Sequence, residues 1–444
     1  MTVDWNYFIS ESGKRWEPSA IRGLFPLEKL PGMVSLLAGK PNAETFPFSA
    51  ITVSLKPLIP GDKPEELVVK SDALTEGLQY GPTNGLTGLV KWLENLQEFK
   101  HSRSKQDSDW KVSVGSGSQD LINKAFCSLV NPGDSILLET PVYPGTLGLL
   151  KQHDVSLIEI PVDEKGLRPD LLEDTLANWE TKYPGKRFPK LLYTIPTGSN
   201  PTGCSSPLER RKKILSLVRH YNLLLLEDDA YHYLSFDPEH SIPSYFELEA
   251  TEGEEEGGKE LGRVVRFDSF SKILSSGMRL GFLTAAKPLV DIVDLNTSNT
   301  NLQPSSTTQA IVLVLLNKWG LEGFLDHTKR VAAFYKAKRD MFEEIAHKYL
   351  DGLATWVTPG AGMFLFLNLQ LTKDGTEQGD SSELISTTAV KKGVLAVPGI
   401  GFLPNGGKSS HVRVSFSLAT EQDAELAFQR LRDCILEARG EEVL

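Results

Sequence analysis

The sequence predicts an α/β protein that combines a large, mainly parallel sheet covered by helices with a smaller α+β domain. Between residues 111 and 284, short apolar runs alternate with segments of helical spacing. Several runs are apolar throughout, which indicates strands buried on both faces, as in a parallel sheet. After residue 311, long helical periodicity is interrupted by two short strand-like segments, a pattern typical of an α+β domain.

Seven segments have the length and composition of strands of the large sheet. In chain order they are Lys111–Gly115, Ser135–Glu139, Val155–Pro161, Lys190–Ile195, Leu223–Glu227, Arg263–Asp268 and Leu280–Thr284. Apolar residues at helical spacing predict helices between them over residues 121–129 and 210–220. Because ligands of parallel sheets gather where strands end, the residues that follow these strands are candidates for a binding site.

The C-terminal region has the pattern of a separate α+β domain. Helices are predicted over Ile311–Leu350 and Glu421–Arg439, and strands over Phe364–Leu367 and Val412–Phe416. We therefore expect three parts along the chain. They are an N-terminal arm that joins the small domain (1–50), a large domain (51–315) and a C-terminal small domain (316–444).

The composition excludes several classes of protein. Of 444 residues, 40% are hydrophobic and 24% charged, and 47 Lys and Arg against 58 Asp and Glu give a formal charge of −11. An acidic chain repels polyphosphate, so we expect no nucleic-acid partner, and any phosphate must bind in a local pocket. The longest apolar run, Ala310–Leu316, has 7 residues. It is far shorter than the roughly 20 residues that cross a bilayer, so we expect no membrane partner.

The cysteines point to a reducing compartment. Cys127, Cys204 and Cys434 are too few for a disulfide framework and have no metal-ligand spacing. The first residues, from Met1 onward, have neither a basic start with an apolar core nor an Arg-rich amphipathic character. We therefore expect a cytoplasmic protein without a metal.

The first candidate site residues follow the strand Lys111–Gly115. Gly117 permits close approach of the backbone, and Ser118 and Gln119 open a helix whose free N–H groups can bind one phosphate. Asp120 stands where a dinucleotide fingerprint needs a third glycine, so that fingerprint is incomplete. The alternative is a plain capped turn with Ser118 as N-cap.

A second group combines hydroxyls with positive charge. Ser269, Ser271 and Lys272 end a strand, and Arg279 follows with a guanidinium suited to bidentate phosphate binding. The spacing of Ser269 and Lys272 also occurs in penicillin-binding-type nucleophiles, but the companion motifs Ser-Asp-Asn and Lys-Thr-Gly are absent. An exposed lysine after a strand is the remaining alternative.

Two further features follow other strands. The apolar strand Leu223–Glu227 leads into Asp228, with Tyr231 three residues later. A carboxylate at the end of a buried strand is costly unless it meets a cation, and a protonated pyridine ring is one such partner. Pro196–Gly203, which contains Asn200, is dense in turn-forming residues and predicts a shaped loop.

The run Thr251–Glu260 predicts a surface loop because it carries like charges and no apolar residue. It also contains a near match to a phosphate-binding P-loop. Glu260 replaces the required Ser or Thr, and three glutamates would repel a phosphate, so we reject that interpretation.

The order of these features resembles that of the pyridoxal 5'-phosphate enzymes of fold type I, class I/II aminotransferases. The resemblance covers nearly the whole chain and is greatest to the subgroup of kynurenine/α-aminoadipate aminotransferase and the fungal aromatic aminotransferases. The sequence segments on which the resemblance rests are Leu78–Tyr80, Leu192–Pro196, Arg266–Lys272, Ala361–Phe364 and Val412–Phe416. The resemblance implies that residues 51–315 form the cofactor domain.

The resemblance also implies catalytic roles. Lys272 matches the lysine that forms a Schiff base with the cofactor aldehyde and then moves a proton. Asp228 matches the acid that pairs with the pyridine nitrogen. Tyr231 and Asn200 match the pair that hydrogen-bonds the phenolic oxygen of the cofactor, and Tyr143 matches the aromatic residue that stacks on its ring.

Other matched residues imply how phosphate and substrate bind. The phosphate ligands are Ser118, Gln119, Ser269, Ser271 and Arg279, joined by Tyr80 from the neighbouring subunit, so the resemblance implies an active homodimer. Arg413, with Asn200, matches the arginine that binds the substrate carboxylate. Arg22 and Gly39 fall in the segment that covers the substrate. Lys40 departs from the small or apolar residue usual there, and either alters substrate preference or points into water.

The implied function is amino transfer from an amino acid, with an aromatic donor expected, to a 2-oxo acid in a ping-pong mechanism. The alternative enzymatic function is that of a pyridoxal-phosphate lyase on the same scaffold. An aminotransferase-like sensor domain is the alternative from another class. No basic DNA-binding module precedes the first cofactor strand, which disfavours the sensor.

Overall fold

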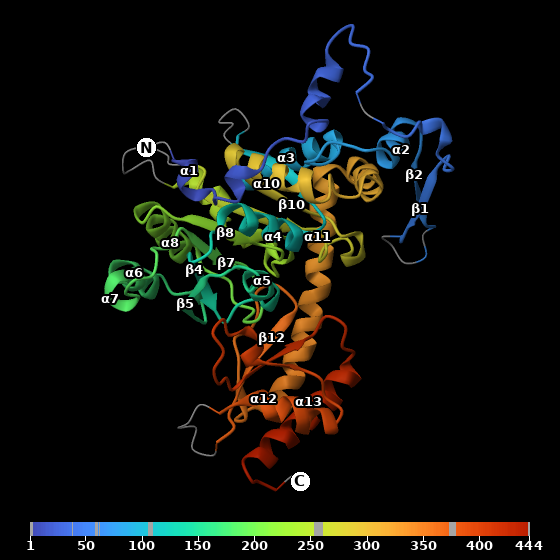
Figure 1. The fold of residues 1–444 in the computed structure, drawn as a ribbon. Helices are drawn as coiled ribbons and strands as arrows, with labels where there is room; N and C mark the ends of the chain where they lie inside the picture. The colour runs from blue at the N-terminus through green and yellow to red at the C-terminus, as the bar shows by residue number, and fades with distance from the viewer. Residues whose placement is uncertain are drawn as a thin grey trace. The chain divides into compact units, whose positions relative to one another are not determined.

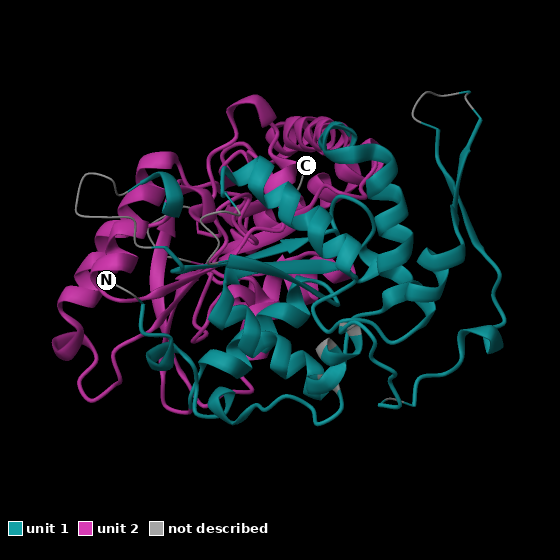
Figure 2. Cartoon of the chain, turned by 90° about the horizontal axis from the view of Figure 1, so that it is seen from above, with its two compact units in different colours: residues 1–131, 249–326 teal, residues 132–248, 327–444 magenta. Residues whose placement is uncertain are grey.

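The computed structural model describes residues 3–37, 39–57, 61, 63–104, 110–252, 261–372 and 379–442 (Figure 1). Most of the predicted acidic loop, residues 253–260, lies outside the described residues. The chain divides into two compact units (Figure 2). Unit 1 contains Met1–Asn131 and Glu249–Asp326, and unit 2 contains Pro132–Leu248 and His327–Leu444.

The N-terminal part of unit 1 has little long secondary structure, as predicted. It contains the short helix α1 (Trp5–Phe8) and an antiparallel hairpin of β1 (Ile51–Leu55) and β2 (Glu65–Val69). The hairpin, drawn in blue, projects from the rest of unit 1 (Figure 1). Helices α2 (Ser71–Leu78) and α3 (Thr87–His101) follow.

Three strands form the sheet of unit 1. Strand β10 (Gly281–Ala286) pairs antiparallel with both β3 (Trp110–Gly115) and β9 (Val264–Ser269). Gly281 lies opposite Gly115 on one side and Ser269 on the other. This register brings the loop after β3 and the loop after β9 to the same edge of the sheet. The helices α4 (Ser118–Leu129) and α10 (Lys287–Thr300) complete this part.

The first sheet of unit 2 is parallel, as the apolar runs predict. Strands β8 (Leu224–Asp228), β7 (Leu191–Thr194), β4 (Ser135–Thr140) and β5 (Ser156–Asp163) lie in this order and run in one direction. The short β6 (Gly166–Leu167) pairs antiparallel with β5. All residues of β7 and β8 are buried, and their carboxyl ends meet at one edge. The helices of this part are α5 (Pro144–Leu150), α6 (Pro169–Ala177), α7 (Trp179–Lys182), α8 (Leu208–His220) and α9 (Tyr245–Thr251).

A second, antiparallel sheet in unit 2 confirms the predicted α+β region. Its order is β11 (Ala354–Thr355), β12 (Phe364–Leu369), β14 (His411–Ser415) and β13 (Val397–Pro398). Apolar side chains of β12 and β14 share a core with α13 (Glu421–Ala438) and the end of α11 (Ser306–Leu350). Short helical segments at Ser381–Glu383 and Leu384–Ala389 cover the same core.

Three details differ from the predictions. The helix α11 is broken at Gly320, where φ is 65°, because a glycine adopts that left-handed conformation at little cost. The N-cap of α4 is Gly117 with φ 91°, so Ser118 is the first helical residue and not the cap. Strand β10 runs antiparallel to both of its neighbours, β3 and β9, although the apolar runs predict a mainly parallel sheet. The compact units also follow other boundaries than the predicted 1–50, 51–315 and 316–444, and that domain division stays a prediction.

Candidate active site

In unit 1, the structure brings the predicted phosphate-binding residues to one edge of the sheet. The Arg279 guanidinium donates from Nη1 to Ser271 Oγ at 3.3 Å and from Nη2 to the Ser116 carbonyl at 3.2 Å. Ser271 N in turn donates to Ser269 Oγ at 3.2 Å. Arg279 therefore links the loop after β9 to the loop that leads into α4, next to the helix-start N–H groups.

Two glycines leave room for this arrangement. A Cβ on Gly117 would lie 2.5 Å from Arg279 Nη2, and a Cβ on Gly281 would lie 2.7 Å from Ser118 N. The φ of 91° at Gly117 also disfavours any other residue. Together with the N–H groups at the start of α4 and the guanidinium of Arg279, the glycines thus form a cradle that fits a single phosphate.

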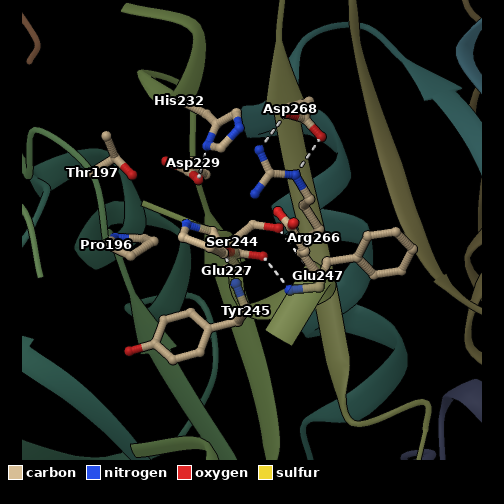
Figure 3. A network of polar contacts seen from close by, with 12 residues as sticks. Pro196, Thr197, Glu227, Asp229, His232, Ser244, Tyr245, Glu247, Arg266 and Asp268 are labelled. Carbon is tan, nitrogen blue, oxygen red and sulfur yellow. Dashed lines mark hydrogen bonds and ion pairs between the residues drawn. The ribbon is translucent and has the colours of Figure 1, made fainter. Parts of the chain in front are cut away.

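Lys272 follows this cradle in a tight turn. Leu274 N donates to the Phe270 carbonyl at 2.9 Å, and Phe270 is 1% exposed. Immediately before the turn, Arg266 and Asp268 on β9 form a buried, bidentate ion pair with distances of 2.9 and 2.8 Å (Figure 3). A planar pair of this kind fixes both side chains, so Lys272 extends from a rigid strand end.

In unit 2, the three consecutive acidic residues at the end of β8, Glu227 to Asp229, each have a different partner. Glu227 accepts from Tyr245 N at 2.8 Å at the start of α9, and Asp229 lies 3.2 Å from His232 Nδ1 (Figure 3). Asp228 Oδ2 accepts a hydrogen bond from the Tyr193 hydroxyl at 2.5 Å. The three neighbouring carboxylates therefore have different partners, and that of Asp228 is a phenol.

Asn200 and Arg413 lie together, as the resemblance implies. Arg413 Nη1 donates to Asn200 Oδ1 at 2.9 Å. The guanidinium lies over the ring of Phe364, 4.1 Å from its centroid, and 5.2 Å from that of Phe402. Burial lowers the pKa of Arg413, whereas Tyr231 and Tyr143 act in the opposite direction. Arg413 Nε is buried and has no hydrogen-bond partner within the described residues, which leaves a donor for a carboxylate.

Two tyrosines of the predicted site are close enough to Arg413 to affect it electrostatically. Tyr231 is 4% exposed, and burial followed by the charge of Asp228 raises its pKa above the usual value. The phenol therefore keeps its proton and can donate. Tyr143 immediately precedes α5, and its ring lies over Gly145, where a Cβ would approach within 2.3 Å.

The loop that carries Asn200 is anchored from two sides. Glu139 accepts from Ser199 Oγ at 3.0 Å, Ile195 N at 3.1 Å and Thr194 Oγ1 at 3.0 Å. Arg211, fully buried on α8, donates to the Pro196 carbonyl at 2.8 Å. These contacts fix the part of the loop that leads into Asn200, so buried groups help to position that residue.

Glu139 makes stability depend on pH. Burial, opposed by its hydrogen bonds and aided by the charge of Asp228, raises its pKa from 4.5 to about 7. Between these values the unfolded chain loses a proton that the folded chain keeps, so the free energy of unfolding falls as pH rises. The expected loss is about 3 kcal/mol, which Glu139→Gln removes.

Urea unfolding of wild type and Glu139→Gln at about pH 5 and about pH 8 measures this effect. The variant should gain stability relative to wild type at the higher pH. An equal difference between the two proteins at both pH values would contradict the assignment.

Three predicted site residues are not part of these clusters. Tyr80 is 52% exposed, and a Cβ added to Gly39 would have no atom within 4 Å. The backbone of Arg22 begins a 3-10 helix, Arg22–Lys29. Lys40 forms an ion pair with Glu28 at 3.0 Å and lies 4.5 Å from the centroid of Phe25, so its charge is compensated within the same segment.

Sequence reasoning missed Tyr193, Glu139 and Arg211. Tyr193 and Glu139 lie in apolar runs that predict buried strands, and a polar group in such a run is a usable signal because it needs a partner. Arg211 belongs to a run of charged residues that predicts a solvent-exposed helix face.

Neither a metal centre nor a membrane span is found in the part of the chain that the structure describes. Its residues contain no group of three or more His, Cys, Asp or Glu side chains that could hold a metal ion. No helix among them is long and apolar enough to span a membrane.

Comparison with known proteins decides the family. Residues 65–431 match the model of the family "Aminotransferase class I and II". The chain belongs to this family. The transaminase prediction is thereby confirmed, as are the fold class and the cofactor, pyridoxal 5'-phosphate, which aminotransferases of this family use.

Individual relatives agree with the predicted subgroup. The aminotransferase is 46% identical to aminotransferase tdiD of Emericella nidulans over 95% of this chain and 94% of that protein. It is 36% identical to the mitochondrial kynurenine/alpha-aminoadipate aminotransferase of Bos taurus over 98% and 100%. The crystal structure of aminotransferase Aro8 from Candida albicans covers 99% of both chains, with 25% identity and a TM-score of 0.86.

Proposed function

We propose that this aminotransferase uses aromatic amino acids as good donors and a 2-oxo acid as acceptor, with Arg413 and Asn200 binding the carboxylate that all these substrates share. The observation that carries the proposal is the Arg413–Asn200 pair, which leaves Arg413 Nε as a buried donor beside aromatic rings. Aromatic surroundings favour a planar, apolar side chain over a charged one. Relatives named for kynurenine and aromatic amino acids support the same choice.

The residues of the two units match the needs of the cofactor. When bound, pyridoxal phosphate withdraws electrons from the substrate α-carbon. In the proposed site, Lys272 would hold the cofactor through its aldehyde and would move the proton of that carbon. Asp228 would pair with the pyridine nitrogen, Tyr231 and Asn200 would donate to the phenolic oxygen, and Tyr143 would cover the ring face.

The phosphate subsite is proposed to consist of Ser118, Gln119, Ser269, Ser271 and Arg279. The cradle at Gly117 supports this assignment, because an added methyl group would displace Arg279. Gly117→Ala should weaken binding of pyridoxal phosphate to the apoenzyme by about tenfold or more, since one charge-assisted contact is lost. Fluorescence titration measures this change.

A matched control for this substitution is Gly148→Ala. Gly148 lies in α5 and has no atom within 4 Å of an added Cβ. The control should bind the cofactor like wild type. Equal affinities of the Gly117→Ala variant and the control would refute the proposed subsite.

We further propose an active homodimer in which Tyr80 reaches the phosphate of the neighbouring subunit, and in which Arg22 and Gly39 cover the substrate. An unusual number of large apolar side chains is exposed in the same N-terminal part, including Leu30, Val34 and Leu36 at 50%, 84% and 97%. Such a surface favours burial against another chain. Sedimentation at several protein concentrations tests the dimer.

We propose a cytoplasmic location because the three cysteines are free, which fits a reducing compartment. Fractionation of cells that express the chain tests it. A mitochondrial fraction, the location named for the bovine relative, would reject it.

One assay tests the substrates and separates the alternatives. The purified protein is incubated with a panel of amino acids and 2-oxo acids, and all products are quantified. Paired formation of a new amino acid and a new oxo acid, fastest with aromatic donors, is expected. Ammonia with pyruvate would favour the lyase, and DNA binding in a gel-shift assay would favour the sensor domain.

A further inference from the structure

The hydrogen bond between Tyr193 and Asp228 is set by the parallel sheet of unit 2. Tyr193 on β7 pairs with Leu226 on β8, two residues before Asp228. Tyr193 is 0% exposed and Asp228 6% exposed. The hydroxyl lies 2.5 Å from Asp228 Oδ2. Because both residues lie in paired strands, this contact belongs to the frame of the protein and does not depend on a loop.

In its hydrogen bond with Asp228 the phenol is the donor. Burial, reinforced by the neighbouring charge of Asp228, raises the pKa of Tyr193 well above its usual value. Tyr193 therefore keeps its proton at neutral pH. A donor on one carboxylate oxygen stabilises the ionised form and fixes the plane of the group.

A second carboxyl makes this assistance necessary. Glu139 interacts electrostatically with both Asp228 and Tyr193. Two buried carboxyls that sense each other do not both ionise readily. Glu139 accepts its hydrogen bonds from Thr194, Ile195 and Ser199, whereas the phenol of Tyr193 is directed to Asp228. The hydrogen bond from Tyr193 thus favours negative charge on Asp228.

We propose that Tyr193 is a positioning residue whose phenol, bound to Oδ2, holds Asp228 as an oriented carboxylate for the cationic ring nitrogen of the cofactor. This inference rests on the proposed pairing of Asp228 with that nitrogen. It explains why a buried strand ends with an acid and why the neighbouring strand carries a buried tyrosine.

The test is Tyr193→Phe, which keeps the ring and removes only the hydroxyl. The apoenzyme is titrated with pyridoxal phosphate and with 1-deazapyridoxal phosphate, in which carbon replaces the ring nitrogen. The variant should bind pyridoxal phosphate about tenfold more weakly or worse, because a charge-assisted hydrogen bond is lost. Its affinity for the deaza compound should be close to that of wild type, since that compound makes no contact that needs a charged Asp228.

Tyr245→Phe is the matched control. Tyr245 is equally buried in unit 2, and its hydroxyl has no hydrogen-bond partner within the described residues. This variant should bind both compounds like wild type. A general effect of removing a buried hydroxyl would weaken binding in both tyrosine variants and would overturn the proposal.

A double-variant cycle with Asp228→Ala tests the route of the effect. Once the carboxylate is gone, adding Tyr193→Phe should change cofactor affinity by less than about twofold. An undiminished effect in that background, or equal loss of affinity for both compounds in Tyr193→Phe alone, would overturn the inference. Failure of the proposed role of Asp228 has a different signature, because wild type and Asp228→Ala would then bind pyridoxal phosphate equally.

Discussion

Lys272→Ala is expected to lower the turnover number by at least about 10⁴-fold, because its amine is proposed both to hold the cofactor and to transfer the proton of the substrate. No other described residue is proposed for either task. The visible absorbance that the bound cofactor gains on joining the lysine should disappear as well. Steady-state kinetics and an absorbance spectrum of the purified variant measure both effects.

Lys287→Ala is the control for that experiment. Lys287 is an exposed lysine at the start of α10 in the same unit. This variant should retain the activity and spectrum of wild type. Steady-state amino transfer that persists in Lys272→Ala would disprove the proposed mechanism, whatever the spectrum shows.

The second large effect is expected for Arg413→Lys. Lysine keeps the positive charge but loses the planar fork that binds a carboxylate through two parallel hydrogen bonds. The contact to Asn200 at 2.9 Å and the packing over Phe364 also depend on the guanidinium. We expect kcat/KM for an aromatic donor to fall by about 10²- to 10³-fold, chiefly through a higher KM.

Arg432→Lys provides the comparison. Arg432 lies on α13, also in unit 2, with its guanidinium over the ring of Tyr349, 5.8 Å from the centroid. The replacement removes a similar arginine–aromatic contact outside the proposed site and should leave KM unchanged. If both variants lose kcat/KM equally, Arg413 acts through folding and not through carboxylate binding.

Most strands could be predicted, because a short apolar run bounded by turn-forming residues fits a strand that is buried on both faces. The direction of β10 could not be predicted in this way, since an apolar run does not indicate whether its strand is parallel or antiparallel to its neighbours. The break at Gly320 was missed for a related reason. A single glycine within helical spacing is tolerated in many helices, and only the φ of 65° distinguishes this one.

The candidate site was predictable in its residue types and not in its contacts. The order of Asn200, Asp228 and Lys272 along the chain carries the resemblance to the family. Tyr193, which hydrogen-bonds Asp228, and Glu139, which binds the loop of Asn200, lie in segments for which the sequence predicts only buried strands. A hydrogen bond between neighbouring strands depends on register, which the residue pattern of one strand does not contain.

The ion pair of Lys40 and Glu28 has a consequence for how such an enzyme changes over time. Arg413 and Asn200 lie among buried groups and are proposed to bind the carboxylate that every amino acid has. Lys40 and Glu28 lie in the N-terminal segment, where their other contacts are Phe25 and Ser35, and they contribute little to folding because ion pairs near the surface are weak. Because the same segment is proposed to cover the substrate, we expect mutations there to change side-chain preference at small cost in stability, while the residues proposed for amino transfer stay unchanged.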